Sequence, residues 1–524
     1  MGQSKNPYLT HIHNVIPQLL AMFDMDVSSP TYGQGDRFRS AWKLIDFGNG
    51  TFQGAANGLA RLLVNNQLPE YLCEESVLKR IDAMFYGAGM LRRANGSMEE
   101  AFPYESSFCV TSLVAYDLLT TIELLNIKLS SAKQKSYLTI VEPMIRFLHQ
   151  VDETHAFISN HLATAAVALF KWSSLTGDNG AKRGALFLNR ILQEQSNEGW
   201  FREYDGADPG YQTLCTYYLA DLHRLHPEIG LLGPLRKSIQ FLWYFAHPDG
   251  SFGGYYGSRN TRLYYPAGIE LLGKDIPEAA ALADFMRESI VQNACVTLGC
   301  MDPPNLIPMF NSYCWTTTIL KNSLEDNLHQ KTEGHTLPSL SHDSWQKYFK
   351  EAGLIVDKRK DSYTIISAHK GGVVYSYQGA HCKIDTGVVI KDTKGRLYSS
   401  QGYNQDNQVA LDDDKISITA KFSCMKKQLP SPLQFILLRI LNITVMRSSN
   451  MGNWIKKQLV RYLITGKNFA PLSNQRTINL DNTLEISDEF KGNISEFQKV
   501  SISTPFSAIH MASQGYWQRQ DDEI

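Results

Sequence analysis

EGWFRE, at residues 198–203, opens a loop of a kind that recurs along the first part of the chain. NGSMEE at 95–100 and DGSFGG at 249–254 open similar loops, each with glycine in second position. The glycines at 96, 199 and 250 indicate a unit of about 51 residues, with one degenerate copy near 150–161. Such a unit accommodates two helices and a long loop, and it must stack on its neighbours to bury its apolar faces. If the stack closes into a ring, the equivalent loops meet on one rim.

The two parts of the chain differ in their apolar patterns. From about residue 10 to 325 the pattern is helical, as in 110–125 and 163–175, with apolar residues at three- and four-residue spacing. From about 340, short β-branched and aromatic runs alternate with glycine turns. We therefore predict an α+β multidomain protein. An N-terminal (α/α) toroid of helical hairpins over 1–330 is followed by a smaller antiparallel β-sandwich over 340–524, with the boundary within 322–342.

The overall composition is that of an ordinary globular protein. The chain has 524 residues and a net charge of -1, which points neither to nucleic acid nor to an acidic tail. The eight cysteines form no C-x-x-C pair, so we expect no metal site, and we expect no cofactor. The N-terminus lacks a signal-peptide pattern, and no apolar stretch reaches the length of a membrane span. A cytoplasmic location is the expectation.

A basic stretch lies inside the β-rich part. Residues 416–480 contain ten Lys or Arg and no Asp or Glu, whereas the rest of the chain sums to -11. Within it, 425–467 is predicted to be a basic amphipathic insertion. It suits peripheral contact with an anionic inner membrane face or a groove for an acidic polymer. The alternative is an insertion that packs its apolar side on the toroid. No nucleic-acid motif accompanies the charge.

Four loops carry the residues best suited to chemistry: 95–108, 151–161, 197–212 and 247–268. Together they supply Tyr, Trp, Asn, His, Arg and several carboxylates. This mixture is typical of sugar sites, where aromatic faces stack on pyranose C–H surfaces and planar polar groups bind hydroxyls. Arg, His and Asn would in addition bind an anionic sugar. The residues predicted to contact substrate are Glu100, Tyr104, Trp200, Tyr204, Asp208, Gln212, Tyr256, Arg259, Asn260 and Tyr265.

Two motifs in these loops resemble a known family. Ser159-Asn160-His161, followed by an apolar helix, resembles the Asn-His pair at a toroid helix start in heparinase II/III-like and alginate-type polysaccharide lyases. Residues 199–203 together with 209–212 resemble the family's Gly-aromatic-Glu loop, which ends in Tyr-Gln or Tyr-His. The resemblance covers about residues 90–320, and the β part only as architecture. In one departure, the β part has only His369 and the segment 379–385 where the family has a His-rich strand motif.

The resemblance implies β-elimination on a uronate-containing, acidic polysaccharide. Asn160 and His161 would neutralise the uronate carboxylate and stabilise the enolate-like intermediate. Tyr211 would remove the C5 proton, and Glu203 would orient Tyr211 or a partner. A free tyrosine has a pKa of about 10, so a nearby cation, Arg259 or Arg262, would have to lower it. A role in bacterial surface-polysaccharide metabolism would fit.

Three alternatives remain open on the sequence. A toroidal glycoside hydrolase would use two opposed carboxylates, Glu203 with Asp208 or Asp249. A uronate C5-epimerase would share the proton removal but return the proton on the other face. A non-catalytic module would bind polysaccharide at the membrane. Toroidal terpene cyclases and prenyltransferases are excluded, because the helical part has no Asp-rich motif.

Overall fold

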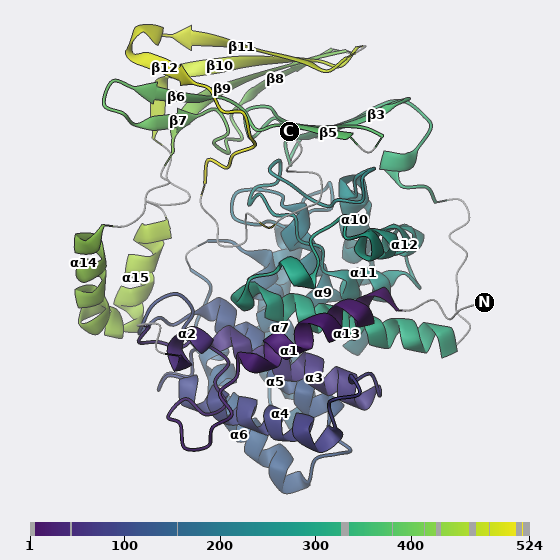
Figure 1. Ribbon diagram of the computed structural model, residues 1–524, viewed down its shortest axis with the longest axis vertical. Helices are drawn as coiled ribbons and strands as arrows, with labels where there is room; N and C mark the ends of the chain where they lie inside the picture. The colour runs from purple at the N-terminus through teal and green to yellow at the C-terminus, as the bar shows by residue number, and fades with distance from the viewer. Residues whose placement is uncertain are drawn as a thin grey trace.

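The protein has a helical body with two β-sheets on one end (Figure 1). The computed structural model describes residues 6–41, 45–154, 156–325, 335–379, 381–412, 414–425, 431–460, 468–481, 483–509 and 516. The predicted fold, an (α/α) toroid followed by antiparallel sheets, is confirmed. The last toroid helix ends at Glu325, and the first strand begins at Trp345.

The inner ring of the toroid is built from six of the described helices. Each contacts the next, and the last contacts the first, so the ring is closed. In ring order these are α3 (Ala55–Val64), α5 (Phe108–Leu124), α7 (Ser159–Thr176), α9 (Pro209–Leu225), α11 (Pro266–Leu272) and α13 (Pro303–Glu325). Their apolar residues form one continuous core, which agrees with helices that are hydrophobic on most faces.

An outer helix packs on each inner one, forming the predicted helical hairpins. The outer helices are α4 (Glu74–Leu91), α6 (Ser131–Gln150), α8 (Gly180–Gln193), α10 (Leu232–Leu242), α12 (Pro277–Gln292) and α1 (Pro7–Ala21). A short helix, α2 (Arg37–Ser40), lies in the loop before α3. Because α5, α7 and α9 begin at Phe108, Ser159 and Pro209, the repeat and its degenerate copy fall where the glycine spacing predicts them.

A buried charge network ties inner helices together away from the rim. The Lys171 ammonium of α7 lies 2.6 Å from a Glu123 carboxylate oxygen and 3.3 Å from an Asp221 oxygen. Asp221 of α9 also accepts hydrogen bonds from Tyr116 (2.9 Å) and Arg224 (2.7 Å). Burial alone would raise the pKa of Asp221, but the surrounding cations hold it well below its usual range. The network therefore joins α5, α7 and α9 by charge as well as by packing.

Replacing Lys171 by methionine should destabilise the fold by about 3 kcal/mol, because it removes a counter-charge from the buried Asp221 carboxylate. Lys128→Met is the matched control, since Lys128 pairs with Glu74 at 2.6 Å on the surface. It should cost less than about 1 kcal/mol. Urea unfolding followed by circular dichroism measures both. Equal losses for the two variants would contradict the role assigned to the network.

The β-domain is a sandwich of two antiparallel sheets. The first sheet has the order β1-β2-β3-β4-β5 and the second the order β11-β10-β9-β7-β6-β12, with β8 paired to β9. The strands are β1 (Trp345–Phe349), β2 (Leu354–Arg359), β3 (Ser362–Ser367), β4 (Val373–Gln378), β5 (His381–Asp385), β6 (Val389–Asp392), β7 (Leu397–Ser399), β8 (Gln408–Leu411), β9 (Lys415–Cys424), β10 (Phe469–Asn479), β11 (Glu485–Gly492) and β12 (Phe497–Val500).

The three central strands of the first sheet, β2–β4, are buried on both faces. Ile355, Ile366 and Val374 pack against Ile418 and Ile478 of the second sheet. The alternate residues of β2–β4, such as Val356, Ile365 and Tyr375, pack with Trp200, Phe241 and Tyr256 of the toroid. Alternation along a strand sends successive side chains to opposite faces, so β2–β4 carry apolar side chains on both faces. The sheet therefore sits directly on the toroid's loop rim.

Two helices are inserted between β9 and β10. Helix α14 (Pro432–Ile443) and helix α15 (Ser449–Val460) lie beside the toroid, at the left of Figure 1. They account for the described part of the predicted 425–467 insertion; residues 426–430 and 461–467 lie outside the described ones. Among the residues that the structure describes, none of the helices combines the length and apolar composition needed to cross a membrane.

Candidate active site at the toroid rim

The loops before α7 and α9 are joined on the rim by backbone pairing. Ile158 and Glu203 form an isolated antiparallel bridge, and the Ser159 N–H donates to the Arg202 carbonyl at 3.1 Å. A third loop is attached because the Ser258 hydroxyl donates to the Glu203 carbonyl at 3.0 Å. Three of the four predicted loops, far apart in sequence, therefore meet at one place.

Two glycines allow this loop its tight path. Gly199 has φ of 99°, which favours glycine, and a Cβ there would collide with the Lys237 carbonyl. A Cβ at Gly206 would collide with the Tyr403 hydroxyl of the β-domain. The loop thus makes two close approaches: Gly199 lies against the outer helix α10, and Gly206 lies against the β-domain.

Glu203 and Asn160 form the buried centre of the site. The Asn160 side-chain amide donates to both Glu203 carboxylate oxygens at 2.9 Å, and its backbone N–H donates to one of them at 3.0 Å. An Arg259 guanidinium nitrogen lies 3.5 Å from the same carboxylate. Burial raises the pKa of Glu203 to about 7, although Arg259 and Asn160 oppose the shift. The Asn160 amide therefore donates to Glu203, whereas the sequence analysis assigned it to the carboxylate of the substrate.

Arg259 links Glu203 to two tyrosines. Its guanidinium carbon lies 3.6 Å from the Tyr211 ring centroid and 5.0 Å from that of Tyr204. These are cation–π distances, and Tyr211 keeps partial solvent exposure at the rim. Burial raises the pKa of Tyr204 to about 12, so this phenol stays protonated. Of the two cations predicted to lie beside Tyr211, Arg259 does so, whereas Arg262 stacks on Tyr255 at 4.8 Å.

Tyr204 is held in an unusual backbone conformation. Its φ is 60°, which is rare for a bulky residue and marks local strain. Its N–H donates to the Phe157 carbonyl at 2.9 Å, which fixes the turn. Tyr204 interacts electrostatically with Arg259, Tyr211, Glu153 and Glu203, so it lies at the meeting point of the cluster.

His161 is oriented by a carboxylate that the sequence did not single out. Its Nδ1 lies 2.7 Å from a Glu153 oxygen. A carboxylate only accepts hydrogen bonds, so Nδ1 carries the proton of this contact. Glu153 is buried, whereas His161 keeps 13% of its side chain exposed. The pair therefore fixes the orientation of the imidazole ring.

The β-domain contributes a lysine that sequence reasoning missed. Lys370, in the turn between β3 and β4, donates to the carbonyls of Tyr255 (2.5 Å) and Gly257 (3.0 Å) and to the Asn260 side chain. Burial lowers the pKa of Lys370 to about 7. Asn260 in turn donates to the Ser507 hydroxyl at 2.7 Å. Asn260, predicted to contact substrate, is instead held by the β-domain and the C-terminal segment.

Four predicted substrate contacts are corrected because their side chains are buried and occupied. Trp200 and Tyr256 belong to the core between toroid and sheet, and Tyr256 bonds His247 at 2.7 Å. Gln212 donates to the Ser238 hydroxyl at 2.8 Å. Asp208 caps α9 by accepting from the Tyr211 N–H at 3.0 Å, and it accepts from the Arg259 N–H at 2.9 Å. These residues build the loops. Hydrophobic aromatics and cap residues cannot be told from ligands by composition.

The remaining three predicted contacts differ in position. Tyr265 is buried and interacts electrostatically with Tyr211 and Arg259, so it forms a wall of the cluster. Glu100 accepts from the Ser107 hydroxyl at 2.8 Å within its own loop. The Tyr104 hydroxyl lies 3.2 Å from an Arg447 nitrogen of the insertion. Glu100 and Tyr104 therefore lie on the loop that faces the insertion.

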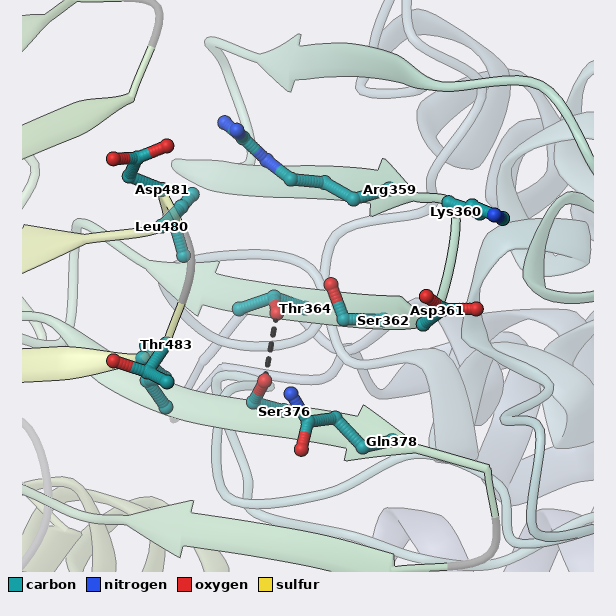
Figure 2. Close-up of a pocket in the computed structure, with 11 residues that line it drawn as sticks. Arg359, Lys360, Asp361, Ser362, Thr364, Ser376, Gln378, Leu480, Asp481 and Thr483 are labelled. Carbon is teal, nitrogen blue, oxygen red and sulfur yellow. Dashed lines mark hydrogen bonds between the residues drawn. The ribbon is translucent and has the colours of Figure 1, made fainter.

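A cavity of about 210 Å³ lies elsewhere, on the β-domain. Figure 2 shows it between the ends of β2–β4 and residues Leu480, Asp481 and Thr483. Thr364 and Ser376 on its floor bond each other at 2.8 Å, and Arg359 is paired with Asp357 at 2.9 Å. Two of its polar side chains thus bond each other, and Arg359 bonds a residue outside the lining. It has no acid–base cluster comparable to the rim.

The raised pKa of Glu203 predicts a pH-dependent stability. A carboxyl with a higher pKa when folded binds a proton that the unfolded chain has lost between pH 4.5 and about 7. The stability contributed by this group therefore falls as pH rises through that window. Glu203→Gln cannot titrate, so its stability should improve relative to wild type between pH 5 and 7.5 by at most about 3 kcal/mol. Thermal unfolding at both pH values measures this. If the difference in stability between the variant and wild type is the same at both pH values, Glu203 does not titrate in this window.

Comparison with solved structures supports the architecture. The Streptomyces coelicolor A3 chondroitin AC lyase matches with a TM-score of 0.50 and 10% identity, over 81% of this chain and 68% of that one. Heparinase III matches with a TM-score of 0.46 and 10% identity, over 91% of this chain and 80% of the heparinase III chain. A Paenibacillus xanthan lyase matches with a TM-score of 0.47 and 12% identity. The match covers 81% of this chain but only 46% of the xanthan lyase chain.

The fold is that of the (α/α)-toroid polysaccharide lyases. At these identities the likeness shows the fold alone. A cellobiose 2-epimerase matches 60% of this chain with a TM-score of 0.43, and a family 76 glycoside hydrolase matches 61% with a TM-score of 0.40. No family model matches the sequence. No curated protein matches it either.

Proposed function

We propose that the chain is a polysaccharide lyase that cleaves a uronate-containing, acidic polysaccharide by β-elimination. The observation that carries the proposal is the stacking of Arg259 on Tyr211, at 3.6 Å, in a rim that also holds the His161–Glu153 pair. A phenol beside a permanent cation and an imidazole beside a carboxylate are the groups that proton abstraction next to a carboxylate needs.

The reaction breaks two bonds and forms a double bond. The base takes the C5 proton of the uronate, and the C5–H electron pair is delocalised into the carboxylate as an enolate-like intermediate. As the C4–O bond breaks, this pair becomes the second bond between C4 and C5, and the departing oxygen takes a proton. No other reactant is required, so a tyrosine that first accepts and then returns a proton balances the step.

In this proposal each rim residue has a separate task. Tyr211 is the base, and Arg259 stabilises the negative charge on its oxygen. His161, which Glu153 orients through Nδ1, donates its Nε2–H in the protonated form to the substrate carboxylate and reduces the charge on the intermediate. Glu203 and Asn160 are positioning residues, since their contacts run to each other and to Arg259.

An acidic substrate is supported by the cations at the rim. The chondroitin AC lyase with the similar fold was solved in complex with chondroitin sulphate, an acidic polymer. Hydrolysis is less well supported. Asp208 accepts from the backbone N–H groups of Tyr211 and Arg259, and Asp249 accepts from Ser251 at 2.6 Å, so both carboxylates are engaged in loop structure. An epimerase would use the same base and is distinguished only by its product.

Mass spectrometry of the products tests the proposal. The chain is incubated with alginate, heparan, hyaluronan and bacterial capsular polymers in turn. Elimination yields fragments whose masses sum to that of the parent, one of them with an unsaturated end. Fragments that together gain one water per cut would establish a hydrolase. Intact chains with altered C5 configuration by NMR would establish an epimerase. Either result, or unchanged polymer throughout the panel, overturns the proposal.

A further inference from the structure

Helix α14 exposes an apolar stripe that the proposed lyase reaction does not use. Leu433, Ile436, Leu437, Ile440 and Ile443 are each more than half exposed, and Leu433 is 77% exposed. Their spacing places them on one side of the helix. Contiguous exposed apolar surface on this scale marks an interaction site in soluble proteins.

The helix is specified by its own sequence. Ser431 and Gln434 form a capping box: each side chain bonds the other residue's backbone N–H. Pro432 occupies the first helical turn, where its missing N–H costs nothing. The start of the helix is therefore specified by its own capping residues, and its apolar stripe is not needed for that.

The segment that contains the stripe is rich in cations in its sequence. Residues 425–467 hold eight Lys or Arg and no acidic residue. Lys457 of α15 is exposed, as is Trp454, whose ring is of the kind enriched at membrane–water interfaces. Arg439 and Arg447 bind the toroid, at Asp46 (3.0 Å) and Tyr104 (3.2 Å). These two contacts fix the hairpin beside the rim without covering its apolar stripe.

We propose that the α14–α15 hairpin docks on an anionic lipid membrane and lies in the interface. The apolar stripe would enter the headgroup–acyl boundary while the cations meet acidic headgroups. With 12 residues, α14 is about 18 Å long, shorter than the bilayer core of about 30 Å, which suits a helix that lies flat.

Two other occupants fit the surface less well. An acidic polysaccharide would use the cations, but a hydroxylated chain gains nothing from a row of leucine and isoleucine. A second copy of this chain would bring like charges together, which is unfavourable. Only a surface with both anionic and apolar layers is complementary to both features.

Co-sedimentation of the full chain with vesicles tests the proposal. Vesicles of phosphatidylcholine with an equal share of phosphatidylglycerol should bind at least tenfold more tightly than vesicles of phosphatidylcholine alone, and salt should weaken the binding. The double variant Ile436→Glu/Ile440→Glu should lose the binding. Leu186→Glu on α8 is the matched control, because Leu186 is 54% exposed and Ile440 51%. It should bind as wild type does.

Three results would overturn the proposal: no binding to either vesicle, equal binding to both, or unimpaired binding of the double variant. If the double variant binds heparin more weakly than wild type does but binds vesicles equally well, the hairpin is instead a groove for an acidic polymer. Circular dichroism and the melting temperature verify that the double variant is folded, as expected for changes at exposed positions.

Discussion

Tyr211→Phe should lower kcat by about 10²–10⁴-fold, the range that a positioned acid–base group contributes. The variant keeps the ring and its stacking on Arg259, which lies 3.6 Å away, but removes the oxygen that accepts the C5 proton. Because the phenol contributes little to substrate binding in this scheme, KM should change less than threefold. Steady-state rates on whichever polymer the wild type cleaves measure both quantities.

Tyr255→Phe is a matched control on the same rim. Tyr255 also stacks on an arginine, with the Arg262 guanidinium 4.8 Å from its ring, but it has no contact with Glu203 or Arg259 among the described interactions. Its backbone bonds to Lys370 and Tyr375 survive the change. Its kcat should stay within about twofold of wild type. If both variants lose the same activity, the phenols act on the shape of the rim and Tyr211 is not the base.

Arg259→Met should lower kcat by about 10²–10³-fold, as expected for the loss of one preorganised stabilising charge. The side chain touches Glu203, Tyr204 and Tyr211, so its removal also leaves the buried Glu203 without a counter-charge. A phenolate without a neighbouring cation forms only at higher pH, so the pH of half-maximal kcat should rise. Measuring the pH–rate profile of the variant tests this electrostatic role.

Arg259→Lys separates charge from shape. Lysine keeps the charge but not the planar group that can face Glu203 and cover Tyr211 together, so it should recover only part of the lost rate. Arg262→Met is the control and should leave the pH–rate profile in place. A loss of stability in Arg259→Met with an unshifted profile would mean that Arg259 only supports the fold.

The fold could be predicted because its repeat is visible in short-range patterns. Glycine-containing loops at a regular spacing indicate helical hairpins. In the structure, α5, α7 and α9 begin one unit apart, at Phe108, Ser159 and Pro209. The closure of the ring depends on contacts between α13 and α3, which are far apart in sequence. The family resemblance, not local pattern, supplied that step.

The site could be predicted only in part. The Asn-His pair and the Gly-aromatic-Glu loop do meet, and Arg259 does lie on Tyr211. Lys370 could not be predicted, because it donates to backbone carbonyls and to a side-chain amide of the other domain. Such contacts between domains correspond to no motif in the sequence. Trp200 and Tyr256 were assigned to substrate because an aromatic side chain in a loop looks the same whether it faces a sugar or a sheet.

The most direct test of the central claim is the ultraviolet absorbance of the double bond that β-elimination creates between C4 and C5. Purified chain is mixed with each acidic polymer of the panel, and Tyr211→Phe is run beside it. The account predicts a steady rise with at least one uronate polymer that Tyr211→Phe all but abolishes. A flat trace with every polymer, while calorimetry still detects binding, would contradict elimination and leave an epimerase or a binding module.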